Sequence, residues 1–301
     1  MTTVIEVKNL VKTFGRTRAL DGLDLSVDEG EVHGFLGPNG AGKSTTIRVL
    51  LGMLRARSGD ATVFGRDPWR DAVAIHRDVA YVPGDVSLWP NLSGGEAIDF
   101  LTRLRGGTDA ALRSRLLRDF DLDPKKKGRS YSKGNRQKVA LVAAFARPAK
   151  LYILDEPTSG LDPVMESMFR SEIERVRKDG ATVLLSSHIL SEVEQLCDRV
   201  TIVRAGKAVE TGTLSDMRHL TRTSFRVATR AKLADIQSIA GVHDARSEAD
   251  QLVFDADTDA VDGVLSALTK AGVSSLSVAP PSLEDLFLRH YGDRIETEPA
   301  A

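Results

Sequence analysis

Short apolar runs alternate with segments of helical spacing over most of the chain, up to about residue 220. Runs such as Val32–Leu36 have the length of buried strands, and many segments between the runs place apolar residues on one face of a helix. This alternation predicts an α/β fold with a mixed sheet that is largely parallel, with an antiparallel part near the N-terminus. The predicted strands are Ile5–Val7, Leu23–Val27, Val32–Leu36, Ala61–Phe64, Val79–Val82, Leu151–Leu154, Thr182–Leu185 and Val200–Val203.

The strand signals stop between Asp85 and Pro148, where helical patterns take over. These patterns cover Ala97–Arg105, Ala110–Phe120 and Asn135–Arg147. We therefore predict that a helical subdomain of about residues 85–148 is inserted into a first domain of residues 1–219.

The residue pattern changes again after about residue 220. The strand-like segment Ser224–Ala228, a hairpin-like pair around Val242 and Val253, and a helix with Val264 and Leu268 on one face predict a small α+β appendage over residues 220–291. Ser282 and Asp285 form a capping-box pattern for a short helix near its end. Residues 292–301 read as a disordered tail.

Composition sets the broad class of the protein. The chain has 301 residues, 42% of them hydrophobic, which is ordinary for a soluble globular protein. A net charge of −1 offers no broad footprint for nucleic acid, so no nucleic-acid partner is expected. The longest apolar stretch, Val139–Ala146, is far too short to span a bilayer, and the polar N-terminus lacks a signal-peptide pattern. The chain is expected to stay in the cytoplasm, and its one cysteine, Cys197, excludes an internal disulfide.

A glycine-rich loop carries the strongest chemical signal. Residues 37–44 read Gly-Pro-Asn-Gly-Ala-Gly-Lys-Ser, the phosphate-binding pattern G-x-x-x-x-G-K-[ST] between a predicted strand and a helix-like run. Glycines let backbone N–H groups turn inward around phosphates. Lys43 can reach the β- and γ-phosphates, and the Ser44 hydroxyl can ligate Mg²⁺. A nucleoside triphosphate is therefore expected to bind at Gly37, Pro38, Asn39, Gly40, Ala41, Gly42, Lys43, Ser44 and Thr45.

Two adjacent carboxylates end the predicted strand Leu151–Leu154. Asp155 is suited to support Mg²⁺, directly or through water, and Glu156 to orient or deprotonate an attacking water. Paired acids at a strand end also occur as a solvated turn or a helix cap, but the upstream phosphate loop favours catalysis. Downstream, Ser159–Asp162 forms a turn, and His188 follows the strand that begins at Thr182.

In order and spacing, these motifs resemble those of the nucleotide-binding subunits of ATP-binding-cassette transporters, over residues 4 to about 215. The resemblance implies an ATPase with a P-loop NTPase cassette fold, in which two cassettes sandwich two Mg-ATP molecules. It implies that His188 senses the γ-phosphate and that Asp162 belongs to the nucleotide site. Phe14 matches the position of the aromatic residue that stacks on adenine, although a place in the core stays open for it.

Two segments compete for the family's signature motif, which contacts the nucleotide of the partner cassette. Leu92–Glu96 looks more like the usual Leu-Ser-Gly-Gly-Gln than Tyr131–Asn135 does. In the family, however, the signature begins the helix that leads directly into the strand of paired acids, as the helix from Asn135 does here. The resemblance therefore assigns Ser132, Gly134 and Asn135 to the γ-phosphate of the partner. A hydroxyl, an unhindered backbone N–H and a helix N-terminus all suit an anion.

One position departs from the family. Gly84 stands where the family usually has a glutamine that touches Mg²⁺ or water and links to the membrane subunit. Glycine has no side chain to coordinate anything, so the usual link is in doubt. Either the following Asp85 substitutes for the glutamine or a water fills the gap.

The chain has one cassette and no predicted membrane span, so a transporter built on it needs permease subunits on separate chains. A second cassette is also required, from another copy of this chain or from a relative. The segment Pro281–Leu288 and the Ser-Lys-Gly-Asn signature are similar to those of drug- and polysaccharide-type exporters. We therefore expect the ATP-hydrolysing subunit of an exporter, peripheral on the cytoplasmic face of the membrane. The alternatives are a cassette ATPase acting on nucleic acid or the ribosome, and a catalytically silent regulatory cassette.

Overall fold

The computed structural model describes residues 2–219, 222–230, 236–248 and 251–279. The chain divides into two compact units, Met1–Thr211 and Gly212–Ala301. This division falls earlier than the boundary near residue 219 that the change of residue pattern suggested. The expected helix after Ser282 and the expected tail at residues 292–301 lie outside the described residues.

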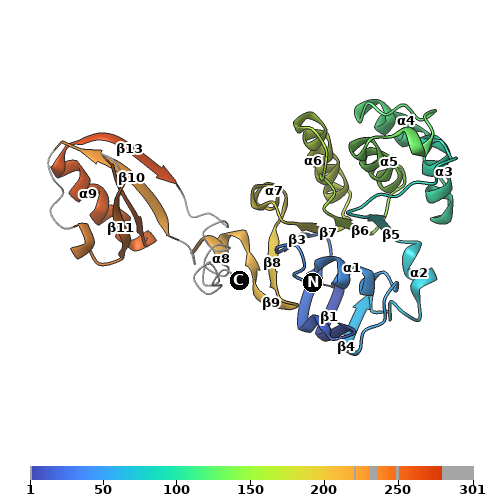
Figure 1. The fold of residues 1–301 in the computed structure, drawn as a ribbon, viewed down its shortest axis with the longest axis horizontal. Coiled ribbons are helices and arrows are strands. Elements are labelled where there is room, and N and C mark those ends of the chain that lie inside the picture. Colours follow the sequence, from blue (N-terminus) through green and yellow to red (C-terminus); the bar gives the residue numbers. More distant parts are fainter. Residues whose placement is uncertain (1, 220–221, 231–235, 249–250, 280–301) are drawn as a thin grey trace, which may run out of the picture. The chain divides into compact units, whose positions relative to one another are not determined.

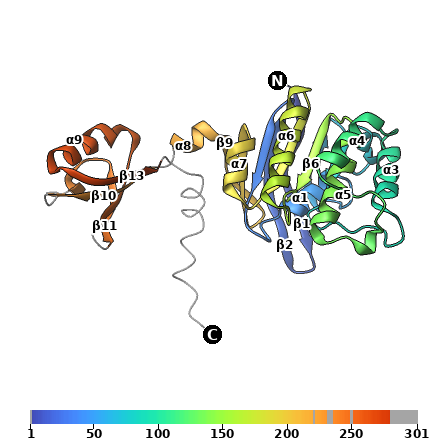
Figure 2. The same ribbon diagram turned by 90° about the horizontal axis from the view of Figure 1, so that it is seen from above.

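The first unit is built on two sheets (Figures 1 and 2). A six-stranded sheet has the order β5-β6-β7-β3-β8-β9, and its first five strands run parallel. A three-stranded antiparallel sheet has the order β2-β1-β4. The mixed α/β arrangement predicted from the sequence is therefore confirmed. The strands are β1 (Thr3–Phe14), β2 (Thr17–Asp28), β3 (Val32–Leu36), β4 (Ser58–Val63), β5 (Val79–Val82), β6 (Leu151–Asp155), β7 (Thr182–Ser187), β8 (Arg199–Arg204) and β9 (Lys207–Thr213).

A hydrophobic core of this unit combines residues of the two sheets with residues of helix α1 (Lys43–Leu50) and with Ile75. The parallel strands β3 and β6 are buried along their whole length, which explains their continuous apolar runs. Helices α6 (Pro163–Lys178) and α7 (Leu190–Leu196) lie on the opposite side of the six-stranded sheet from β1 and β4 (Figure 1). The core residues include Ile5, Leu23, Phe35, Ile47, Ile153 and Leu184.

Between β5 and β6 the chain is helical, as the sequence predicted. The segments are α3 (Gly94–Leu104), α4 (Ala110–Asp119), the 3-10 turn η1 (Gly128–Ser130) and α5 (Lys133–Phe145). Helices α3 and α4 both pack on α5. Phe145 at the end of α5 stacks on Tyr152 of β6, with ring centroids 5.3 Å apart. This contact connects the helical segment to the central sheet. The remaining helix of the first unit is α2 (Ala72–His76), and α8 (Leu214–His219) begins the second unit.

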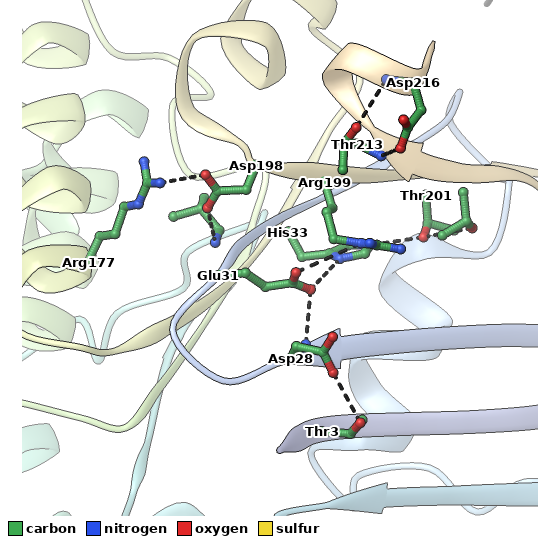
Figure 3. Close-up of polar contacts among 12 residues, drawn as sticks. Thr3, Asp28, Glu31, His33, Arg177, Asp198, Arg199, Thr201, Thr213 and Asp216 are labelled. Atoms are coloured by element: carbon green, nitrogen blue, oxygen red, sulfur yellow. Dashed lines mark hydrogen bonds and ion pairs between the residues drawn. The ribbon is translucent and has the colours of Figure 1, made fainter. Parts of the chain in front are cut away.

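A wholly buried histidine, His33, is the second residue of β3 (Figure 3). Its Nδ1 is 2.9 Å from Glu31 Oε1, and its Nε2 is 2.9 Å from Thr201 Oγ1. Burial opposes the ionisation of Glu31, but the hydrogen bond with His33 and a second from the Asp28 N–H keep the pKa of Glu31 below its usual value. Both ring nitrogens of His33 are therefore satisfied, and the group joins β3 to β8 inside the sheet.

The second unit is a four-stranded antiparallel sheet, with the order β11-β12-β10-β13 and one longer helix, α9 (Val261–Ala271). Phe225 and Phe254 stack at its centre with ring centroids 5.1 Å apart. The predicted strand at Ser224–Ala228, the hairpin-like pair around Val242 and Val253, and the helix with Val264 and Leu268 are present. Further elements of the unit are β10 (Thr223–Thr229), η2 (Ile236–Ser238), β11 (Val242–Glu248), β12 (Gln251–Ala256), η3 (Thr258–Ala260) and β13 (Val273–Ala279).

None of the helices within the described ranges is long and apolar enough to cross a membrane.

A buried carboxylate joins α4 to α6. Glu172 of α6 accepts hydrogen bonds from Arg115 Nη1 at 2.6 Å and Nη2 at 2.9 Å, and from Arg175 Nε at 2.8 Å. Burial alone would raise the pKa of Glu172, but the two arginines outweigh it and the pKa lies below its usual value. The three charged groups therefore stabilise the fold when Glu172 is ionised.

We predict that Glu172→Gln lowers the free energy of unfolding of the first unit by about 2 kcal/mol at pH 7, because it leaves Arg115 and Arg175 without their charged partner. This corresponds to a fall of roughly 4–8 °C in the midpoint of thermal unfolding. The stabilisation by ionised Glu172 is present above the ordinary carboxyl pKa and is lost as pH falls through the lowered pKa of the folded protein. The difference between wild type and variant should therefore shrink below about pH 4. An unchanged midpoint at pH 7 would contradict this account.

Candidate functional site

The loop between β3 and α1 requires glycine for two physical reasons. A Cβ on Gly37 would lie 2.4 Å from the carbonyl oxygen of Val203, so a larger residue would clash with β8. Gly42, the N-cap of α1, has a φ of 114°, which side chains disfavour. In the described structure, no side chain caps the N-terminus of α1 through a hydrogen bond, and the first turn of α1 carries no acidic residue. The N–H groups at the N-terminus of α1 are therefore suited to bind an anion.

Lys43 lies inside this loop and is only 4% exposed. Its Nζ donates hydrogen bonds to the carbonyl oxygens of Gly37 at 2.5 Å and Pro38 at 3.2 Å. Burial lowers the pKa of Lys43, while the charges of Glu156 and Asp155 act in the opposite direction. Because phosphate oxygens are stronger hydrogen-bond acceptors than neutral carbonyl oxygens, the buried Lys43 ammonium is well suited to bind a phosphate. Next to it, Ser44 and Thr45 are half-buried, and Asn39 and Gly40 are exposed.

Glu156 lies between two nitrogen-bearing side chains. Its Oε1 is 3.7 Å from Lys43 Nζ and 3.3 Å from His188 Nδ1. These residues follow β6, β3 and β7, which are parallel neighbours in the sheet and therefore end at the same edge. The structure thus brings together the lysine, the glutamate and the histidine that the sequence singled out.

The backbone of Glu156 is strained, with a φ of 47°. Its N–H donates to the Ser186 carbonyl oxygen at 3.0 Å, and its own carbonyl oxygen accepts from Ser159 N–H at 3.1 Å. Such a conformation persists when surrounding hydrogen bonds over-determine it. These bonds fix the direction in which the carboxylate leaves the strand.

Asp155 is buried at the end of β6, and its Oδ1 accepts a hydrogen bond of 2.5 Å from the Ser186 hydroxyl. Among the described residues there is no group of three or more His, Cys, Asp or Glu side chains that could hold a metal. Mg²⁺ commonly uses one or two protein oxygens together with substrate phosphates. The Asp155 carboxylate and the Ser44 hydroxyl have this chemistry, so the residues present fit a Mg²⁺ ion that arrives with a nucleotide.

Gly84 adjoins this carboxylate. A Cβ at position 84 would lie 3.2 Å from the Asp155 carbonyl oxygen and 3.7 Å from its Oδ2. A glutamine here would therefore reach the carboxylate expected to support Mg²⁺, and glycine leaves that space to solvent. Asp85 is exposed, and its role stays a prediction.

The signature assigned by position begins α5. Ser132 is the N-cap, and its Oγ accepts from Asn135 N–H at 3.3 Å. A Cβ on Gly134 would lie 2.4 Å from the Gly160 carbonyl oxygen, and Lys133 Nζ donates to Ser159 Oγ at 3.0 Å. The segment therefore lies against the loop that follows Glu156.

The competing segment begins α3 and is already fully engaged. Ser93 and Glu96 form a capping box, and the N–H groups of Gly94 and Gly95 donate to the Lys126 and Pro124 carbonyl oxygens at 3.0 and 2.8 Å. These donors serve the fold of the helical segment. The geometry therefore favours the N-terminus of α5 over that of α3 as a place for a partner's phosphate.

Two further expected residues occupy exposed positions. Phe14 ends β1 with 46% of its surface exposed, and Lys12 Nζ lies 5.2 Å from its ring centroid. The ring is therefore outside the core and open to stacking. Asp162 caps α6, where its Oδ1 accepts from the N–H groups of Val164 and Met165 at 3.1 and 3.0 Å. Its contact with a nucleotide stays a prediction.

Sequence reasoning did not foresee the side chain that supports Asp155. Ser186 supplies that hydrogen bond from the neighbouring strand. The available signal was a pair of serines directly after the apolar part of β7. Gln137 of α5 contacts the same region, because its Nε2 donates to the Pro157 carbonyl oxygen at 2.8 Å in the loop after Glu156.

Comparisons with known proteins agree with the site. A family model described as ABC transporter matches residues 20–159. The daunorubicin resistance ATP-binding protein DrrA3 of Streptomyces coeruleorubidus is 34% identical over 99% of each chain. The bacitracin transport ATP-binding protein BcrA of Bacillus licheniformis is 31% identical over 97% of this chain and 98% of its own.

Solved structures give the same result. A structure described as the ATP-binding subunit of an ABC transporter superposes with a TM-score of 0.67, at 34% identity, over 72% of this chain and 92% of its own. A dimeric bacterial ABC transporter cassette superposes with a TM-score of 0.63, at 22% identity, over 70% of this chain and 98% of its own, which supports the fold alone.

We predict that Gly134→Ala reduces ATP turnover at least about 100-fold, because its methyl group would displace the backbone that should meet the phosphate of the partner. Binding of ATP to the single chain should persist, since the phosphate loop is untouched. Steady-state hydrolysis and a fluorescent-nucleotide titration measure the two effects.

Gly95→Ala is the matched control. A Cβ there would meet the flexible end of Arg113 at 3.1 Å and Pro124 at 3.2 Å, so small shifts can accommodate it and most turnover should remain. Loss of turnover in Gly95→Ala together with normal turnover in Gly134→Ala would reverse the assignment of the signature.

Proposed function

We propose that two copies of this cassette close over two Mg-ATP molecules and drive a membrane exporter. The premise is that this chain belongs to the ABC transporter family as an ATP-binding subunit and is an ATPase. The pore of this exporter would be built by separate chains. The single observation that carries the proposal is the meeting of Lys43, Glu156 and His188 at one edge of the parallel sheet.

Nucleotide binding is proposed to use the phosphate loop and the first turn of α1. Backbone N–H groups of residues 37–45 would surround the phosphates, and Lys43 would exchange its bonds to the Gly37 and Pro38 carbonyl oxygens for phosphate oxygens. Phe14 would stack on the adenine. Ser44 and Asp155 would hold Mg²⁺, which neutralises charge on the phosphates when bound.

Hydrolysis is proposed to depend on Glu156 as the group that orients water and accepts its proton. The neighbouring Lys43 ammonium, 3.7 Å from Oε1, would leave the carboxylate for the phosphates once ATP is bound. His188 would then be free to donate a hydrogen bond to the γ-phosphate while remaining beside Glu156. The strained backbone of Glu156 holds its carboxylate in place throughout.

A second cassette is proposed to complete each site through Ser132, Gly134 and Asn135. This segment contacts the loop after Glu156 of its own chain through the Lys133–Ser159 hydrogen bond. Because the same ATP would contact both chains, it favours the closed dimer, and the loss of its γ-phosphate removes that preference. A homodimer is proposed, since one chain carries both halves of the shared site.

Coupling to the membrane subunit is proposed to use an apolar pocket of about 310 Å³ beside β5 and the helical segment. Leu104 and Trp89 in its lining are 66% and 47% exposed, so the pocket opens onto an apolar surface. A short amphipathic helix of a permease would cover them. The lining continues to Pro83, next to Gly84, so a helix in the pocket would adjoin the position where the usual glutamine is missing. Other lining residues are Leu51, Met53, Tyr81 and Leu88.

The cargo class is proposed by extension from relatives. The names of those relatives give daunorubicin resistance and bacitracin transport as their roles. Export of a drug-like or antibiotic small molecule by a complex at the cytoplasmic face of the membrane is therefore the proposed task of this chain.

We predict that Glu156→Gln lowers the Mg²⁺-dependent turnover of ATP at least about 100-fold, because the amide cannot accept the proton of water. The variant should bind ATP and accumulate as a dimer with ATP but not with ADP, since the γ-phosphate contacts persist. Light scattering coupled to size-exclusion chromatography measures the dimer.

Wild type with ADP serves as the control for nucleotide binding without the γ-phosphate. A Glu156→Gln chain that stays monomeric at saturating ATP would exclude ATP-driven closure as the working step. A variant that retains wild-type turnover would remove Glu156 from the reaction.

A further inference from the structure

The short turn that carries His188 has a second polar cluster behind it. This cluster, here called the Glu192 cluster, consists of Ser187, Glu192 and Thr158. Ser187 is the last residue of β7, Glu192 lies in the first turn of α7, and Thr158 belongs to the loop after Glu156. None of the roles given above uses these three side chains.

Two hydrogen bonds connect Glu192 to the backbone on both sides of His188. The Ser187 hydroxyl donates to Glu192 Oε2 at 2.7 Å. The same Ser187 oxygen accepts from the N–H of Ile189 at 2.9 Å. The Ser187 side chain therefore connects residue 187 to the backbone of Ile189, and Glu192 holds that side chain in position.

The neighbouring serine faces the other way. Ser186 donates to Asp155, whereas Ser187 donates to Glu192, as expected for adjacent residues of a strand. The end of β7 therefore connects the proposed Mg²⁺ carboxylate on one side with the Glu192 cluster on the other. His188 is the next residue along the chain.

Fold stability does not account for a carboxyl group at this position. Glu192 Oε1 is buried, and no described residue forms a hydrogen bond with it. The pKa of Glu192 is raised, chiefly by burial and also by the charge of Glu166. Hydrogen bonding by Ser187 and Thr158 and the charge of His188 lower the pKa, but they do not outweigh burial. Glu192 also lines a pocket of about 90 Å³, together with Thr158, Glu166 and Arg170. An apolar side chain would avoid this desolvation cost.

We propose that Glu192 is a positioning residue for hydrolysis, which fixes the His188 turn against Glu156 through Ser187. The inference rests on the proposed roles of His188 and Glu156. The route from Glu192 to the reaction is short: Ser187 is bonded to His188, whose Nδ1 lies 3.3 Å from Glu156 Oε1. A displacement of about 1 Å in such a group is enough to cost roughly 100-fold in rate.

Four full-length variants test the inference: Glu192→Ala, Glu192→Gln, Ser187→Ala and the double variant Glu192→Ala/Ser187→Ala. Each is compared with wild type in Mg-ATP hydrolysis, with kcat and KM determined separately. Glu174→Gln, at an exposed carboxylate of α6, is the control. Thermal unfolding of every variant measures its stability.

Glu192→Ala and Ser187→Ala should each lower kcat about tenfold or more and leave KM within about twofold, because the phosphate loop is unchanged. Glu192→Gln keeps an acceptor for the Ser187 hydroxyl and should stay within about threefold of wild type. The double variant should be no slower than the slower single variant, within about twofold, because both substitutions break the same bond.

Unchanged kcat in Ser187→Ala overturns the inference, as does a double variant whose losses multiply. Damage in Glu192→Gln equal to that in Glu192→Ala also overturns it, because this would mean that the carboxylate itself is needed. If Glu192→Ala does not fold, Ser187→Ala and Glu192→Gln still decide the matter. Absence of turnover in wild type, or normal turnover in Glu156→Gln, would instead contradict the proposed function.

Discussion

The parallel pairing of β6, β7 and β3 is the constraint on which the site depends. These strands are neighbours in the six-stranded sheet and run in the same direction. Their ends therefore deliver Asp155 and Glu156, then Ser187 and His188, then the phosphate loop, to one edge. The contacts of Glu156 with Lys43 and His188 follow from this order, although the three residues are far apart in the chain. Burial of the strands on both faces makes the order rigid.

Around this edge, hydrogen bonds hold several of the polar groups in place. Ser186 holds Asp155, and the carbonyl oxygen of Ser186 also holds the strained backbone of Glu156. Lys43 is held by carbonyl groups of its own loop until a stronger anion replaces them. Each reacting side chain is thus positioned before the nucleotide arrives, which reduces the reorganisation needed during hydrolysis. By the further inference, the Glu192 cluster positions the turn of His188 in the same way, through hydrogen bonds formed before the nucleotide arrives.

Much of the fold and of the site could be predicted because local pattern and position carry them. Val32–Leu36 and Val79–Val82 are strands with the bounds that their apolar runs predict. Strand β9 was missed because Lys207–Thr213 has a single buried residue and carries little apolar signal. The turn before it, with positive φ at Ala205 and Gly206, marks the hairpin. Ser186 and Glu192 could not be assigned, since their partners lie on other elements. Residue similarity alone favoured Leu92–Glu96 as the signature, and only the location of the following helix indicated Ser132–Asn135.

The central claim is that each nucleotide site is shared between two chains. Mixing two inactive variants tests it most directly. Lys43→Ala removes the lysine of the phosphate loop from one chain, and Ser132→Glu places a carboxylate against the nucleotide of the partner. Random dimers of the two are half mixed, and each mixed dimer has one intact site, formed by the phosphate loop of the Ser132→Glu chain and the signature of the Lys43→Ala chain. The mixture should recover ATP turnover up to roughly a quarter of the wild-type value. A mixture no more active than its separate components would contradict a shared site.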